Sequence, residues 1–388
     1  MPYISTSSNR LIPLEASRGI AASIVIAHHF FLGFVPSYEP RIIGRWYYVF
    51  VNGTGAVHFF FVLSGFVLCW AYFNTADLNR LKEGFFKRLP RLAAPVLVTT
   101  IASFCLFYFG LYYFESASKI SESTWLASFG GAIRPGFEPS LYEAIRQGLT
   151  TFVTGDANYN INLWTMKPEF IGSMVVFMAA AFISIVLSFK YLGISFLLLS
   201  LWALGAYADV FPFVAGIFLS AAVVSSRPNV RLPIALVAVL LGIYLLGYAI
   251  PDKHYSWAKY LAYLDIRAGN IEIILHSIGA CLIIFSIIGN SKIYKSLNGK
   301  FCNYLGVFSF PLYLVHTLVI CSFSSLMYLL LNQEGYSNNL ALSALLILTF
   351  AASVLASIPL VAFDNFWLKL VNRMVKKALG LNQTAGKA

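Results

Sequence analysis

Charged residues are scarce in this 388-residue chain. Asp, Glu, Lys and Arg make up 11% of it and hydrophobic residues make up 59%, against averages of about 25% and about 45–50% in soluble domains. So few charges cannot cover the surface of a soluble protein. The composition therefore excludes a soluble enzyme, a disordered chain and a nucleic-acid-binding domain, and we expect no nucleic-acid partner.

Cysteine is also rare. The five cysteines are far apart and form no Cys-x-x-Cys pair; they are Cys69, Cys105, Cys281, Cys302 and Cys321. This spacing favours neither a disulfide framework nor a zinc knuckle. We therefore expect no structural metal in this protein.

Long apolar runs, in contrast, are abundant. About 20 apolar residues in a helix span the roughly 30 Å hydrocarbon core of a bilayer. We identify ten such runs, at residues 14–35, 54–74, 92–114, 169–188, 190–207, 209–225, 232–250, 270–289, 304–331 and 339–362. The pattern predicts an all-α integral membrane protein with about ten transmembrane helices.

The basic residues predict its orientation. The chain has 27 Lys and Arg against 16 Asp and Glu, and most of the basic residues fall inside if both termini are cytoplasmic. Cytoplasmic loops are the ones enriched in Lys and Arg, so we expect an N-in, C-in protein of the plasma (inner) membrane. We expect one transmembrane domain over residues 1–365, with a long outer segment at 115–168, and a basic cytoplasmic tail at 366–388.

The first apolar run contains ionisable residues, which are costly inside a membrane and therefore mark candidate functional sites. Arg18 and His29 are 11 residues apart, which is about 20° from the same helical face, whereas His28 is about 80° away from Arg18. Glu15 lies near the same face. The pattern favours His29 over His28 on this polar face. In the alternative interpretation, Glu15 and Arg18 only anchor the helix end and the two histidines cap its outer end.

Two further polar clusters lie at predicted helix ends. Arg88 and Arg91 are three residues apart around Pro90, which fits a helical first turn, and paired guanidinium groups suit a phosphorylated ligand. The alternative is ordinary enrichment of basic residues in the cytoplasm. Trp164 precedes Glu169, which would lie at the first turn of the fourth predicted span, where a carboxylate also serves as a helix cap.

Two weaker candidates lie within predicted spans. Tyr313 and His316 are three residues apart on the ninth span, where a lone histidine is often only an interhelical hydrogen-bonding residue. Ser64 lies in the second span without the sequence context of a nucleophile elbow. Packing against a neighbouring helix explains this serine equally well.

Taken together, these motifs resemble the acyltransferase-3 family of multi-pass membrane O-acyltransferases. The resemblance begins with the Arg-x10-His pattern of Arg18 and His29. It continues through the aromatic run that ends at Ser64, the Arg-x-x-Arg motif of residues 88–91, the Trp-Thr-x-x-x-Glu element of residues 164–169 and the Tyr-Leu-x-His element of residues 313–316. These five motifs occur in the family's order.

The resemblance implies transfer of an acyl group, commonly acetyl from acetyl-CoA, to a hydroxyl of a cell-surface or lipid-linked carbohydrate. We expect His29 to act as the general base or as a transient acyl carrier, with Glu15 or Glu169 orienting it and Arg18 either keeping the site polar or binding the donor. Arg88 and Arg91 would meet the phosphates of CoA. Acyl-CoA is then a donor substrate, and we expect no permanently bound cofactor. The expected partners are this donor, the glycan acceptor and membrane lipids.

Phe170 departs from the family pattern, because many members have a second acidic residue after the one corresponding to Glu169. A paired-carboxylate role is therefore not expected here. An alternative function, a transporter or flippase for a lipid-linked glycan, would also use ionisable residues within the membrane. Transporters commonly show internal repeats, and none is evident in this sequence.

Overall fold

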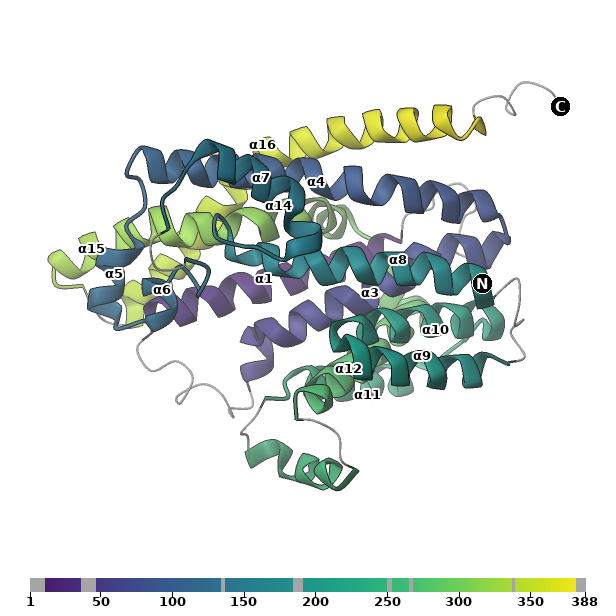
Figure 1. Ribbon diagram of the computed structural model, residues 1–388. Coiled ribbons are helices and arrows are strands. Elements are labelled where there is room, and N and C mark those ends of the chain that lie inside the picture. Colours follow the sequence, from purple (N-terminus) through teal and green to yellow (C-terminus); the bar gives the residue numbers. More distant parts are fainter. Residues whose placement is uncertain are drawn as a thin grey trace. The chain divides into compact units, whose positions relative to one another are not determined.

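The computed structural model describes residues 11–35, 47–133, 137–183, 191–249, 253–264, 268–336 and 339–381, and within these ranges all regular secondary structure is helical (Figure 1). The chain packs as two compact units. The first unit comprises Met1–Ala21, Ile43–Phe86 and Pro168–Val307, and the second comprises Ala22–Ile42, Lys87–Lys167 and Phe308–Ala388.

The helices follow one another along the chain, separated by short connections. The α-helices are α1 (Ile12–Phe34), α3 (Gly53–Thr75), α4 (Leu78–Tyr108), α5 (Phe114–Ser121), α6 (Thr124–Ala127), α7 (Leu141–Thr154), α8 (Met166–Phe182), α9 (Leu192–Ala206), α10 (Phe211–Ser226), α11 (Leu232–Leu246), α12 (Ala268–Gly289), α13 (Ser291–Ser296), α14 (Lys300–Val319), α15 (Ser325–Gln333) and α16 (Asn339–Ala378). The 3₁₀ segments are η1 (Tyr48–Val51), η2 (Ile161–Thr165), η5 (Ala208–Val210) and η6 (Lys253–Leu264), and η7 (Ile320–Ser324) is a π-helical turn.

Seven of the described helical stretches are long and apolar enough to cross a membrane, and α9 and α11 are shorter apolar helices. The seven are Ile12–Phe34, Gly53–Thr75, Leu78–Tyr108, Ala208–Ser226, Gly269–Gly289, Lys300–Gln333 and Asn339–Ala378. The remaining predicted span, 169–188, falls on α8, and its last residues lie outside the described ranges. The predicted fold class, an all-α integral membrane protein, is confirmed.

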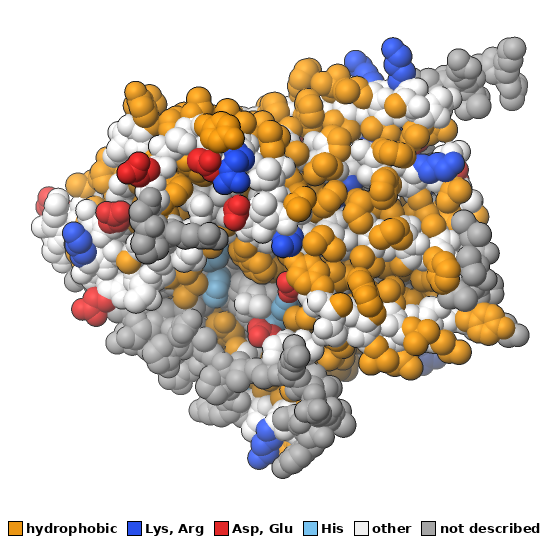
Figure 2. Space-filling view, viewed as in Figure 1, with side chains coloured by type: hydrophobic (Ala, Val, Ile, Leu, Met, Phe, Trp, Pro, Cys, Tyr) orange, Lys and Arg blue, Asp and Glu red, His pale blue; other side chains and the backbone are white. Residues whose placement is uncertain are grey.

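The surface of the helices agrees with this class. Large hydrophobic side chains are exposed along several helices, among them Leu340, Phe301 and Ile347. Figure 2 shows hydrophobic side chains over much of the visible face, with acidic side chains gathered over α5, α6 and α7. Apolar side chains are stable on a surface that faces lipid, because no water has to be ordered around them.

Two helix boundaries differ from the sequence prediction. Pro90 was expected in a first turn, but α4 begins at Leu78, so Pro90 and Pro95 both lie inside this helix. A proline in a helix removes one backbone hydrogen bond, and membrane helices tolerate it when neighbours supply partners. The carbonyl that Pro90 deprives of its helical donor is that of Phe86, one turn earlier. Separately, the indole Nε1–H of Trp367 in α16 donates to the Pro90 carbonyl at 2.7 Å, which ties α16 to α4. At the other end of the chain, α16 continues to Ala378, through the first part of the predicted tail.

Glycines bring the helices of the first unit into close contact. A Cβ at Gly65 of α3 would collide with the Phe213 carbonyl of α10, and a Cβ at Gly216 of α10 would collide with the Val62 carbonyl of α3. Small residues at such crossings are typical of membrane helices, whose association depends on van der Waals packing. The α3–α10 crossing fixes the register of both helices.

Replacing Gly216 with alanine is therefore expected to destabilise the protein. The added methyl group meets backbone atoms, which cannot rotate away, and overpacking of this kind costs about 1–3 kcal/mol. The matched control is Gly193→Ala, on α9, because a Cβ there meets no atom within 4 Å. Thermal unfolding in detergent measures both variants. Equal melting temperatures for Gly216→Ala and Gly193→Ala would contradict the prediction.

In the second unit, an apolar core joins the last turns of α1 to the segment between α4 and α8. Phe30 and Phe34 of α1 are fully buried against a cluster that includes Phe114, Leu126 and Phe129. The amphipathic helix α7 packs against the middle of α4, because a Cβ at its Gly148 would lie 2.7 Å from Thr100 Oγ1 and 2.9 Å from Leu97 Cα. The predicted outer segment thus holds α5, α6, α7 and η2.

Candidate functional site

The first polar pair of the first unit lies on α1. Arg18 Nη1 and Glu15 Oε2 are 3.6 Å apart, one helical turn from each other. The backbone beneath them is fixed, because a Cβ at Gly19 would lie 2.5 Å from the Leu305 carbonyl oxygen and one at Gly306 would lie 2.5 Å from Glu15 Cβ. Glu15 also lies in the first turn of α1, where the helix dipole favours a carboxylate.

The second polar pair of the first unit joins α3 to α8. Ser64 Oγ donates a hydrogen bond to Glu169 Oε1 at 2.8 Å, and Glu169 is only 9% exposed. Ser64 lies midway along α3, and Glu169 lies in the first turn of α8. The ring of Phe213 of α10 packs directly against Gly172, where a Cβ would collide with it, so α8 lies close against α10. Glu169 is thus a buried, hydrogen-bonded carboxylate as well as a residue of a helix N-terminus.

A pair of buried histidines also lies in the first unit. His58 Nδ1 and His276 Nδ1 are 2.8 Å apart, and His276 Nε2 is 2.9 Å from the Tyr248 carbonyl oxygen. A carbonyl only accepts, so His276 Nε2 carries a proton and, when neutral, His276 accepts at Nδ1 from His58. Sequence spacing gave no reason to pair these residues, because 218 positions separate them.

His29 and His316 form the corresponding pair in the second unit. His29 Nδ1 of α1 is 2.9 Å from His316 Nε2 of α14, and their rings are nearly parallel, at 10°. His316 is fully buried, and its Nδ1 is 3.1 Å from the Leu312 carbonyl oxygen one turn earlier. His29 is only partly buried. The π-helical turn η7 begins four residues after His316, and π-turns are frequent at functional sites.

Trp125 covers one face of the His29 ring. The two ring centroids are 5.0 Å apart and the planes differ by 20°. Trp125 belongs to the short helix α6, whose N-cap residue Ser123 donates a hydrogen bond to the Leu32 carbonyl oxygen at 2.6 Å. The segment between α4 and α8 is thereby attached to the last turns of α1. Sequence reasoning missed Trp125, since nothing in its local pattern distinguishes it from other aromatics.

Two buried asparagines attach the segment before α8 to α14. Asn160 Nδ2 donates to the Leu314 carbonyl at 2.7 Å, and Asn162 Nδ2 donates to the Tyr313 carbonyl at 2.8 Å and to Thr317 Oγ1 at 2.9 Å. The Tyr313 hydroxyl donates in turn to the Asn162 carbonyl at 3.2 Å. Tyr313 is therefore part of a structural network. No sequence motif distinguishes Asn160 and Asn162 from other asparagines.

The connection that leads into this network is itself anchored. Tyr159 is buried, its backbone N–H donates to Gln147 Oε1 at 2.9 Å, and its hydroxyl donates to the Ser140 carbonyl at 2.8 Å. Burial raises the pKa of the Tyr159 phenol, which keeps the donor proton in place. Tyr159 thus attaches the loop between α7 and α8 to α7 and to its N-cap residue.

The two arginines of the Arg-x-x-Arg motif differ in environment. Arg88 is 6% exposed, whereas Arg91 is exposed. They share α4 and lie one turn apart. Trp164 is 43% exposed and lies in η2. Within the described ranges, no group of three or more His, Cys, Asp or Glu side chains is arranged to hold a metal ion.

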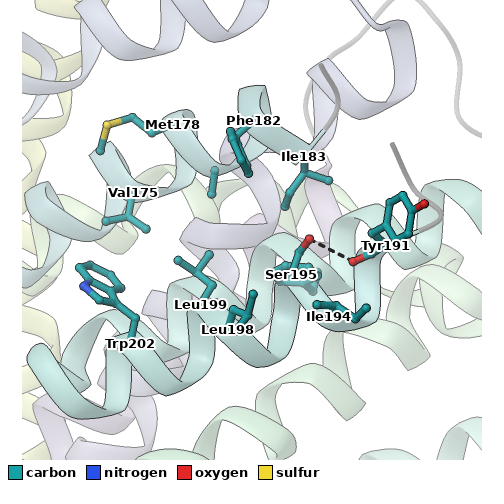
Figure 3. Close-up of a pocket in the computed structure, with 12 residues that line it drawn as sticks. Val175, Met178, Phe182, Ile183, Tyr191, Ile194, Ser195, Leu198, Leu199 and Trp202 are labelled. Carbon is teal, nitrogen blue, oxygen red and sulfur yellow. Dashed lines mark hydrogen bonds between the residues drawn. The ribbon is translucent and has the colours of Figure 1, made fainter. Parts of the chain in front are cut away.

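An apolar pocket of about 770 Å³ lies between α8 and α9 in the first unit. Figure 3 shows Val175, Met178 and Phe182 of α8 facing Leu198 and Trp202 of α9 across it. Two lining side chains carry a hydroxyl group, those of Ser195 and Tyr191, and the Ser195 hydroxyl donates to the Tyr191 carbonyl at 3.0 Å. The rest of the lining is apolar, so the pocket suits a hydrocarbon chain.

The structure therefore brings the predicted residues together in pairs within each unit. The first unit pairs Glu15 with Arg18 and Ser64 with Glu169. In the second unit, His29 contacts His316. His28 lies beside His29 on α1, with ring centroids 5.5 Å apart.

Comparison with known proteins assigns the chain to a family. The Acyl_transf_3 family model, described as an acyltransferase domain, matches residues 13–358. The match covers most of the chain and includes every residue of the candidate site, so it confirms the resemblance seen in the sequence motifs. No curated protein and no solved structure matches the chain.

Proposed function

The chain belongs to the acyltransferase-3 family, and from this premise we propose that it transfers an acyl group, in particular acetyl, from acyl-CoA to a hydroxyl of a cell-surface or lipid-linked carbohydrate. Membership of this family makes the protein a membrane acyltransferase and implies an acyl donor and an acceptor. The nature of the donor and of the acceptor is our proposal.

The observation that supports acyl transfer best is the contact between His29 and His316. A hydroxyl is a weak nucleophile, and a neutral imidazole is the side chain suited to remove its proton near neutral pH. His29 is partly exposed and hydrogen bonded at one ring nitrogen. Its other ring nitrogen has no hydrogen-bond partner among the described residues, so it is available to a substrate.

The proposed reaction balances as follows. The acceptor oxygen attacks the thioester carbonyl while His29 takes the hydroxyl proton. The C–O bond forms, the C–S bond breaks, and the CoA thiolate leaves and takes the proton back from the imidazolium. The products are an O-acyl ester and CoA. In a variant of this scheme His29 attacks first and carries the acyl group transiently.

The remaining polar residues receive supporting roles in this proposal. Arg18 lies on the same helix as His29, and its ion pair with Glu15 keeps this stretch of α1 polar. Glu169, the buried carboxylate bonded to Ser64, orients a polar group of the substrate or of the site. Arg88 and Arg91 bind the phosphates of CoA, for which the guanidinium fork is well suited.

Radiolabelled acetyl-CoA tests the proposed function. Membranes that contain the wild-type protein are expected to transfer label to the carbohydrate fraction as an ester that mild alkali releases, and membranes without the protein are not. If glycan crosses the membrane but no label enters it, the protein is a transporter and the proposal fails. If a non-carbohydrate fraction takes up the label, acyl transfer stands and the acceptor assignment fails.

A further inference from the structure

The hydrogen bonds around His316 determine where its proton lies. The Leu312 carbonyl only accepts, so the nitrogen 3.1 Å from it, His316 Nδ1, is protonated. In a neutral His316 the other nitrogen, Nε2, then carries a lone pair. His29 Nδ1 lies 2.9 Å from that lone pair, so His29 Nδ1 is the donor and His29 Nε2 is left without a proton.

A hydrogen bond in the opposite direction, donated by His316 to His29, would require a positively charged His316. For His29 Nδ1 to accept, both nitrogens of His316 would have to carry protons, and a charged imidazolium in an apolar helix bundle is costly. The titratable groups that face His29 are His28 from α1 and His316 from α14, while Trp125 from α6 does not titrate. Among the described residues, no carboxylate forms a hydrogen bond or ion pair with His29 or His316. The neutral arrangement is therefore the stable one.

The ring of His29 is fixed in orientation as well as in protonation. His316 holds one edge of the ring and Trp125 covers one face. Trp125 has little freedom, because a Cβ at Gly130 would lie 3.1 Å from its Nε1 and one at Gly33 would lie 3.8 Å from its ring. With the ring held in this way, Nε2 lies on the edge of the His29 ring away from the hydrogen bond to His316.

We propose that His316 is a positioning residue that holds His29 in the Nδ1–H tautomer, so that Nε2 is the atom that takes the proton of the acceptor hydroxyl. The catalytic part of this statement rests on the proposed function, but the tautomer does not. Free histidine favours the Nε2–H tautomer. Without His316, the lone pair of His29 would shift to Nδ1 and the base would face the wrong side of its ring.

Nitrogen NMR tests the tautomer without any turnover. The chain has six histidines, and their ¹⁵N-labelled ring nitrogens give well-separated signals when protonated and when bare. The His29 signals are identified by their loss in His29→Gln protein in bilayers. We expect a protonated Nδ1 and a bare Nε2 at neutral pH. A protonated His29 Nε2 in the wild-type protein would overturn the proposal whether or not the protein transfers acyl groups.

Two substitutions at position 316 test the positioning role. In His316→Gln the side-chain carbonyl can still accept from His29 Nδ1–H, whereas His316→Leu offers no acceptor. We expect a fall of about 10-fold or more in kcat for the leucine variant and of less than about threefold for the glutamine variant, with KM unchanged in both. The spectrum of the leucine variant should show protonated His29 Nε2. Equal activities in two folded variants, or equal spectra, would contradict the proposal.

Discussion

His29→Gln is expected to reduce acyl transfer by about 10²–10⁴-fold, the range in which a general base contributes. Glutamine keeps a polar side chain of similar length, and its amide can still donate to His316 Nε2, so the helix contact is retained. It has no group that can accept a proton at neutral pH. Steady-state transfer of label from acetyl-CoA in membranes measures the effect, with protein level determined by immunoblot.

His28→Gln is the matched control for this substitution. His28 is the neighbouring residue on the same helix, so the control reproduces the change in composition and polarity at nearly the same depth. We expect His28→Gln to keep activity within about threefold of the wild type, because His29 holds the contact with His316. Full activity of His29→Gln at normal protein level would exclude both the general base and the acyl relay. Loss of activity only in His28→Gln would transfer the role to His28.

Arg88→Ala is expected to raise the KM for acyl-CoA by about 10–100-fold, because hydrogen bonds to charged groups contribute about 1.5–3 kcal/mol each. Its effect should depend on the phosphates of the donor. With an acyl-pantetheine donor, which has none, wild type and variant are expected to react at the same rate. This comparison uses each protein as its own folding control.

Arg91→Ala is the comparison variant for Arg88→Ala. Arg91 lies one turn from Arg88 but is exposed, and an exposed arginine contributes less because water screens it. We therefore expect a smaller rise in KM for Arg91→Ala than for Arg88→Ala. If Arg88→Ala slows both donors equally, the residue supports the structure of α4 and does not bind phosphate.

Much of the fold was predictable because a lipid bilayer allows few kinds of protein structure to span it. Backbone groups in hydrocarbon must be satisfied within the helix, and a span needs about 20 apolar residues. Each of the ten apolar runs therefore overlaps a helix within the described residues. The end of the fourth run, the first residue of the fifth and the last residue of the seventh lie outside those residues, and the third run extends beyond the end of α4. Boundaries were less predictable. Pro90 falls inside α4, because membrane helices tolerate an internal proline that would end a helix in water.

The candidate residues were predictable as types and the contacts were not. Ionisable side chains stand out against an apolar background, so Glu15, Arg18, His29 and Glu169 could be chosen from composition and helical spacing. The residues that these side chains contact could not be predicted in this way. Ser64 meets Glu169 across 105 positions, and glycines at helix crossings, which no periodicity identifies, decide that contact.

By itself, the sequence determined that this chain is a helical membrane protein and that one face of its first helix carries Arg18 and His29. Only the tertiary structure decided which nitrogen of His29 is free. That choice depends on His316, 287 positions away, on the Leu312 carbonyl that fixes its proton, and on Trp125 from a segment with no recognisable motif. The physical reason is that helical periodicity sets the direction of a side chain, whereas its hydrogen-bond partners are set by packing between helices that are distant in the chain.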